Sequence, residues 1–155
     1  MNIFSELEVQ YFEIDDDLAS KEFDARSRRN IKSERLLKQK RELNTHAYFL
    51  FAFTRLEDHI REQSSKLISK KQVKLMYWKS RAAWDILPSQ KSSDEITFMK
   101  RVALLTDKSR NHYGLIKRYY DERNTIGHGG NFNIPINMTD VFRDMKQLLK
   151  ILKKY

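Results

Sequence analysis

Residues that interrupt regular secondary structure are scarce in this chain: only 4 glycines and 2 prolines occur among its 155 residues. Because β-rich folds need many tight turns, this scarcity argues against them and favours long helices. The lack of cysteine excludes disulfides, thiolate nucleophiles and cysteine-ligated zinc. The length suits one domain with a substantial core and is too short for two comfortable ones. We therefore expect an all-α fold, a single-domain antiparallel bundle of five to six helices.

The central helix of this bundle is expected to begin after Asn44, which is a good N-cap residue. Tyr48, Leu50, Phe51 and Ala52 fill the other sides of its first half, so we expect that half to be buried nearly all round. The residues that recur at helical spacing form one mainly apolar stripe, made of Phe49, Phe53, Leu56, Ile60, Ser64 and Leu67.

The remaining segments are also read as helices, apart from residues 1–14, whose weak alternation fits either a strand or a helix. Asp15 to Asp17 suit a helix N-terminus, and the basic residues that follow predict one long exposed helix to about Arg41. Further helices are expected at 73–87, after a capping box of Ser92 and Glu95, from about Ser109 to Gly127, and after Thr139 as N-cap.

Charge is distributed unevenly along the chain. Residues 1–24 contain eight acidic residues and one basic residue, a net charge of −7, so the other residues carry +16. This pattern indicates an acidic N-terminal arm, residues 1–16, attached to a basic helical domain, residues 17–155, that attracts a polyanion. Solvated Lys and Arg on helix surfaces are the alternative explanation.

Several classes of function find no support in the sequence. No apolar run is long enough to cross a bilayer, and the first residues do not look like a secretion signal, so we expect a cytoplasmic protein without a membrane partner. Phosphate-binding and dinucleotide-binding glycine loops are absent. Asp15 to Asp17 could hold a hard cation, but a capping role is favoured. His46, His59, His112 and His128 show no i, i+4 pairing, so no metal or cofactor is expected.

One segment combines groups that suit phosphodiester chemistry. Arg123 precedes His128 by five positions, and glycines lie around the histidine. On an unbroken helix the two side chains would lie about 140° apart. We expect the glycines after Ile126 to turn the chain so that both side chains reach one cleft. There imidazole could transfer a proton and guanidinium could hold phosphate oxygens. The alternative is an ordinary helix C-terminus.

This segment resembles the R-x4-6-H signature of HEPN domains, carried here by Arg123-Asn124-Thr125-Ile126-Gly127-His128. The resemblance implies an all-α, metal-independent endoribonuclease of a toxin-antitoxin or other defence system. It implies that Arg123 and His128 are the catalytic pair with Asn124 in support, that the enzyme is a homodimer, and that a neutralising antitoxin or defence partner exists. Some toxin members have tyrosine where this chain has Gly130, which argues against the subgroup that an antitoxin modifies.

RNA is therefore the expected partner, cleaved by attack of its 2′-hydroxyl on the adjacent phosphorus. The candidate RNA-binding side chains are all basic and are Arg28, Arg29, Lys32, Arg35, Lys70, Lys71, Lys74, Lys117 and Arg118. Tyr113, Tyr119 and Tyr120 could stack on bases but suit a core or dimer contact better. Residues 1–17 could compete with RNA for the basic surface. The alternative to a nuclease is a catalytically inactive HEPN-like module that binds RNA or a protein.

Overall fold

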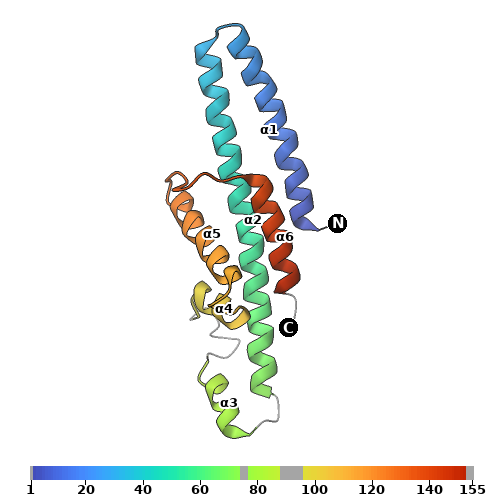
Figure 1. Ribbon diagram of the computed structural model, residues 1–155, viewed down its shortest axis with the longest axis vertical. Coiled ribbons are helices and arrows are strands. Elements are labelled where there is room, and N and C mark those ends of the chain that lie inside the picture. The colour runs from blue at the N-terminus through green and yellow to red at the C-terminus, as the bar shows by residue number, and fades with distance from the viewer. Residues whose placement is uncertain (1, 74–76, 88–95, 153–155) are drawn as a thin grey trace. The chain divides into compact units, whose positions relative to one another are not determined.

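The computed structural model describes residues 2–73, 77–87 and 96–152, and these residues form helices and no strand (Figure 1). The prediction of an all-α fold is confirmed. The six helices are α1 (Ile3–Ser27), α2 (Ile31–Val73), α3 (Trp78–Asp85), α4 (Phe98–Leu105), α5 (Asn111–Gly127) and α6 (Met138–Ile151).

The chain divides into two compact units. Unit 1 comprises Met1–Thr54 and Glu122–Lys146, and unit 2 comprises Arg55–Asp121 and Gln147–Tyr155. The single-domain bundle therefore stays a prediction, and each unit is described by itself.

A helical hairpin forms the first part of unit 1, where the sequence predicted one long helix to Arg41. That prediction is wrong, because the chain reverses after Ser27. Arg29 takes the left-handed conformation, with φ 56°, and Asn30 donates its backbone N–H to the Ala25 carbonyl at 2.8 Å. This is the geometry that usually places glycine at a helix end. Asn30 then caps α2, because its Oδ1 accepts from the Ser33 backbone N–H at 3.1 Å.

The N-terminal segment left open by its sequence is helical. Asn2 caps α1 by accepting from the Phe4 backbone N–H at 3.1 Å. Asp15 to Asp17 lie in the middle of α1, so their predicted capping role is wrong. The boundary predicted between residues 16 and 17 falls inside α1, and the division into an acidic arm and a helical domain stays a prediction.

The predicted start of the central helix at Asn44 is wrong, because α2 runs without a break from Ile31 to Val73. No glycine or proline occurs in this range, and nothing therefore interrupts the helix. The expectation that this half of the helix is buried on nearly all sides is wrong at Phe51, which is 58% exposed. The predicted stripe is confirmed, since all six of its residues are buried: Phe49, Phe53, Leu56, Ile60, Ser64 and Leu67.

The later helices begin and end near the predicted positions. Val73 ends α2 instead of opening the next helix. Ser92 and Glu95 lie outside the described residues. For α6 the cap is Asn137 and not Thr139, because the Thr139 backbone N–H donates to Asn137 Oδ1 at 2.9 Å.

The core of unit 1 is aromatic around the first helix. Tyr11 of α1 packs against Tyr48 of α2 and Phe142 of α6, with ring centroids 5.7 and 6.0 Å apart. The Tyr11 hydroxyl also lies 3.2 Å from Thr45 Oγ1. Aromatic pairs of this kind stabilise a core beyond the burial of their surface.

Unit 2 buries a charged side chain, Arg101 of α4, which is only 3% exposed. Its Nη1 donates to the Ser64 and Ser65 hydroxyls at 2.9 and 3.2 Å, and its Nε donates to the Ile96 carbonyl at 3.3 Å. These acceptors offset part of the cost of removing the guanidinium from water. Ser64 thereby has a specific role within the otherwise apolar stripe of α2.

Candidate catalytic and RNA-binding sites

The end of α5 carries the predicted catalytic residues in unit 1. The helix continues through Gly127, and the His128 backbone N–H donates to the Asn124 carbonyl at 3.1 Å, as in a regular helix. The reversal comes one residue later, at Gly129, where φ is +80°. The Gly130 N–H then donates to the Thr125 carbonyl at 2.9 Å, which completes a Schellman motif.

This geometry overturns the expected turn between Arg123 and His128. Five helical steps separate the two residues, so their side chains leave the helix about 140° apart. The glycines do close the helix, as predicted, but they do so after the histidine. Within one chain the backbone therefore does not direct the imidazole and the guanidinium to the same side.

Arg123 and Asn124 form the polar part of this helix end. Arg123 is half-buried, and its Nη1 donates to Asn124 Oδ1 at 3.2 Å. This contact restricts the guanidinium, a group whose planar geometry suits phosphate oxygens. His128 is exposed to solvent. The exposed imidazole can exchange protons with a bound molecule.

The loop that follows the motif is tied back to α5. Glu122 is only 4% exposed, and its Oε2 accepts from the Asn133 backbone N–H at 2.8 Å. The Asn133 side-chain amide donates to Thr125 Oγ1 at 2.9 Å. Phe132 packs edge-on against His46 and Phe49, with ring centroids 4.8 and 5.1 Å apart. These contacts hold the helix end and the loop as one piece.

The same turn explains why glycine occupies position 130. A Cβ atom there would lie 2.9 Å from Thr125 Cγ2 and 3.0 Å from the Thr125 carbonyl oxygen. Any side chain at this position would displace backbone that the Schellman bond holds. The local fold therefore disfavours the tyrosine found at this place in some toxin members of the resembled family.

Of the predicted RNA-binding residues, Lys74 lies outside the described residues. Lys117 pairs with Asp121 at 2.7 Å. The described candidates fall into two groups. One group surrounds the turn between α1 and α2 in unit 1, where all members are exposed: Arg28, Arg29, Lys32 and Arg35. The other group lies in unit 2: Lys70, Lys71, Lys117 and Arg118.

Net charge differs strongly between the units. Unit 1 contains 12 Lys and Arg against 13 Asp and Glu, a net charge of −1. Unit 2 contains 18 Lys and Arg against 8 Asp and Glu, a net charge of +10. The excess positive charge of the protein thus belongs to unit 2, whereas the Arg123 and His128 motif belongs to unit 1.

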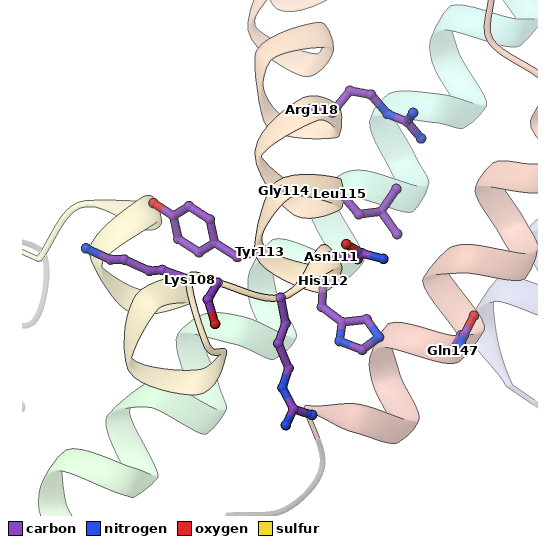
Figure 2. A pocket seen from close by; sticks show the side chains of 10 residues that line it. Lys108, Asn111, His112, Tyr113, Gly114, Leu115, Arg118 and Gln147 are labelled. Atoms are coloured by element: carbon purple, nitrogen blue, oxygen red, sulfur yellow. The ribbon is translucent and has the colours of Figure 1, made fainter.

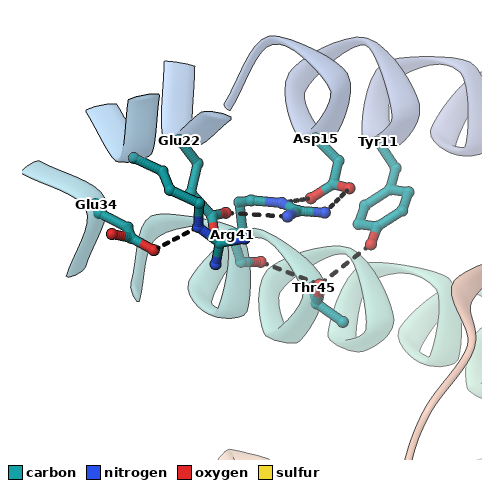
Figure 3. Close-up of polar contacts among 7 residues, drawn as sticks. Tyr11, Asp15, Glu22, Glu34, Arg41 and Thr45 are labelled. Carbon is teal, nitrogen blue, oxygen red and sulfur yellow. Dashed lines mark hydrogen bonds and ion pairs between the residues drawn. The ribbon is translucent and has the colours of Figure 1, made fainter. Parts of the chain in front are cut away.

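The acidic residues of α1 bind basic residues of unit 1 itself. Asp15 and Glu22 both accept from the Arg41 guanidinium (Figure 3), and Glu8 pairs with Lys146. The two carboxylates raise the pKa of Arg41 and keep its charge fixed. These contacts give the acidic residues a structural role. Competition between residues 1–17 and RNA stays a prediction.

The three tyrosines considered for base stacking differ in exposure. Tyr119 is only 2% exposed, and Arg118 lies 5.2 Å from the centre of its ring. Tyr120 is half-buried and stacks on Phe98 at 4.8 Å, and Tyr113 is half-buried. Tyr119 is therefore a core residue, as the helical spacing favoured.

A basic cleft that the sequence did not predict lies at the start of α5. It is lined by Lys108, Arg110 and His112 together with Arg118, of which only Arg118 was a candidate. The run of Lys108, Arg110 and His112 at alternate positions around the start of the helix was the available signal.

The described residues contain neither a cluster of metal ligands nor a helix that could span a membrane. Across 2–73, 77–87 and 96–152, no three histidine or carboxylate side chains cluster in a way that could hold a metal ion. None of the helices in these ranges has a stretch apolar enough, over sufficient length, to cross a membrane.

Comparisons of the chain with protein-family models, with curated proteins and with solved structures give no match.

Proposed function

We propose that this protein is a metal-independent endoribonuclease of HEPN type whose catalytic residues are Arg123 and His128. The observation that carries the proposal is the organised end of α5. There an exposed imidazole and a guanidinium restrained by Asn124 lie on one capped helix end. Both groups suit RNA cleavage without a cofactor.

The reaction needs two proton transfers. A base takes the proton of the RNA 2′-hydroxyl, whose oxygen attacks the adjacent phosphorus. An acid gives a proton to the departing 5′-oxygen, and the products are a 2′,3′-cyclic phosphate and a 5′-hydroxyl. Arg123 binds the phosphate oxygens as charge accumulates on them.

A single chain supplies one motif histidine, and its arginine leaves α5 about 140° away. A two-fold dimer would bring two copies of each residue to one site, so that one His128 acts as base and the other as acid. The proposal therefore includes a homodimer that works in a defence or toxin system, with a neutralising protein as a further partner.

The deciding experiment incubates transfer RNA in EDTA with wild type and with His128→Ala. Wild type should produce cyclic phosphate and 5′-hydroxyl ends, and His128→Ala should lose at least about 100-fold in rate. Circular dichroism must show equal helix content in both proteins. Equal cleavage by both proteins, or cleavage that EDTA abolishes, would refute the proposed site.

A mixing experiment tests the shared site. Wild-type and His128→Ala chains are combined, allowed to exchange, and assayed at increasing variant fraction. A composite site predicts that activity falls faster than the fraction of wild-type chain. Activity strictly proportional to that fraction would contradict a site built from two subunits.

The second candidate is a catalytically inactive HEPN-like module that binds RNA. Its support is the separation of charge from motif, since unit 2 carries +10 and unit 1 carries −1. Salt-sensitive RNA binding without any cleavage product, and without an effect of His128→Ala, would favour this candidate.

A further inference from the structure

Unit 2 contains an open cleft of about 600 Å³ at the beginning of α5. This volume is in the range of sites that hold molecules of nucleotide size. Figure 2 shows Asn111, His112 and Arg118 extending to the side of α5 on which Gln147 lies, whereas Lys108 extends the other way. The lining residues are Lys108, Ser109, Arg110, Asn111, His112, Tyr113, Gly114, Leu115, Arg118 and Gln147.

The cleft is positively charged. Three of its lining residues are Lys or Arg, and no lining residue among those described is Asp or Glu. Within the described residues, Lys108 and Arg118 form no ion pair. The Arg110 Nε atom lies 3.7 Å from a carboxylate oxygen of Asp107, and the Arg110 side chain is 76% exposed. The cations of the cleft are therefore largely uncompensated and can accept an anion.

The carboxylate that pairs with Arg110, that of Asp107, is directed to its own loop. Asp107 Oδ1 accepts from the Ser109 backbone N–H at 2.9 Å and from the Ser109 hydroxyl at 2.7 Å. These two bonds lower the pKa of Asp107 and hold the turn that leads into α5. Asp107 thereby fixes the segment that carries Lys108 and Arg110.

The other polar groups of the cleft suit phosphate oxygens. Asn111 and Gln147 carry amide N–H donors, and His112 can donate through either ring nitrogen according to its protonation. Arg118 presents a planar guanidinium whose geometry matches two phosphate oxygens. A ligand with several phosphates along a chain would also benefit from the +10 charge of unit 2.

We propose that this cleft binds the phosphate backbone of a single RNA strand, with Arg118 as its principal contact. The choice of RNA over another phosphate compound rests on the proposed function. The cleft lies in unit 2 and the Arg123 and His128 motif in unit 1, so the cleft is a binding site in addition to the proposed catalytic residues.

The experiment measures binding without cleavage, in a His128→Ala background. Fluorescence anisotropy with a short single-stranded RNA, repeated at several salt concentrations, compares Arg118→Gln with Arg81→Gln. Arg81 is the matched control because it belongs to unit 2, pairs with Asp85 at 3.0 Å and does not line the cleft. Circular dichroism verifies that both variants keep the helix content of the parent protein.

Arg118→Gln should weaken RNA binding about tenfold and reduce the slope of log affinity against log salt by about 1. Arg81→Gln should change the affinity less than twofold. Equal losses in the two variants would overturn the proposal, because only general surface charge would then be involved.

A second arm separates RNA from free nucleotide by titrating the same proteins with adenosine monophosphate. Binding of the nucleotide that Arg118→Gln abolishes, with RNA affinity unchanged, would also overturn the proposal. Because this assay measures no cleavage, its failure leaves the nuclease test valid, and loss of the nuclease proposal leaves the binding result valid.

Discussion

Arg41 of α2 binds both oxygens of the Asp15 carboxylate of α1, with Nε to Oδ1 at 3.0 Å and Nη2 to Oδ2 at 2.9 Å (Figure 3). Its Nη1 also donates to Glu22 at 3.0 Å. One guanidinium thus joins two carboxylates of the other helix. In this way the acidic residues of α1 hold the hairpin of unit 1 together.

Arg41→Gln should therefore destabilise the protein by about 1–2 kcal/mol, because two neighbouring carboxylates lose their shared cation. Urea unfolding at low salt measures the change. The control is Arg26→Gln, since Arg26 pairs with Glu34 but its side chain is 70% exposed. That variant should lose clearly less stability, because solvent screens its ion pair. Equal losses would show that the double contact of Arg41 has no special weight.

The Tyr11 phenol gives the hairpin a dependence on alkaline pH. Thr45 Oγ1 donates to the Arg41 carbonyl at 3.0 Å, so Tyr11 is the donor in its contact with Thr45. Burial raises the pKa of Tyr11 above its ordinary value. Because the pKa of Tyr11 is higher in the folded than in the unfolded protein, the neutral phenol makes its full contribution to the free energy of unfolding below about pH 10. This contribution is lost as the pH rises through the folded-state pKa.

Tyr11→Phe should cost about 1 kcal/mol near neutral pH through the lost hydrogen bond. The difference in free energy of unfolding between wild type and Tyr11→Phe should then shrink above about pH 10, because only wild type must ionise this phenol. Urea unfolding of both proteins between neutral and alkaline pH measures it. If this difference in free energy of unfolding does not change with pH, the role given to the Tyr11 phenol is wrong.

Arg29 occupies a backbone conformation that glycine adopts with less strain. Its φ is 56°, in the left-handed region, and it closes α1. Arg29→Gly should stabilise the protein by about 1 kcal/mol, less the entropy that glycine adds to the unfolded chain. Arg28→Gly removes the same charge where φ is −85°, and should not stabilise. Thermal unfolding compares them, and equal effects would exclude backbone strain as the cause.

Helical spacing was sufficient to predict the buried stripe of α2, because a 3.6-residue period fixes which side chains share a face. The turn at Arg28 to Asn30 was missed because it contains neither glycine nor proline. The Asn30 cap was its only signal. At the end of α5 glycines are present, but the sequence does not show which of them ends the helix. Gly127 is still helical and Gly129 takes the left-handed conformation, so the turn comes after His128 and not before it.

The basic cleft could not be predicted from spacing. It depends on Gln147 lying beside residues from 108 to 118, far earlier in the sequence, and only tertiary packing brings them together. Charge predicted a polyanionic partner but no location for it, because the sequence does not show that the acidic residues of α1 bind Arg41 and Lys146.

Asn44, expected to cap a helix, instead lies inside α2 with its amide nitrogen buried. Among the described residues no acceptor binds this nitrogen. Asn44→Ala removes an unpaired polar group and improves helix propensity, so it should stabilise the protein by about 1 kcal/mol. Asn44→Asp places a charge at the same position and should destabilise. The midpoints of urea unfolding measure both changes. A loss of stability in Asn44→Ala would show that the Asn44 amide has an acceptor or a packing role.

Glu122 links the end of α5 to the loop that follows His128, and its removal tests how this helix end is held. Glu122→Ala leaves the Asn133 backbone N–H without its acceptor, and should cost about 2 kcal/mol. Glu122→Gln keeps a side-chain oxygen that can accept the same bond, so it should lose clearly less. Limited proteolysis should cut residues 128–137 faster in Glu122→Ala than in Glu122→Gln. Equal cleavage of the two variants would mean that the loop is held by Phe132 and the Schellman motif and not by Glu122.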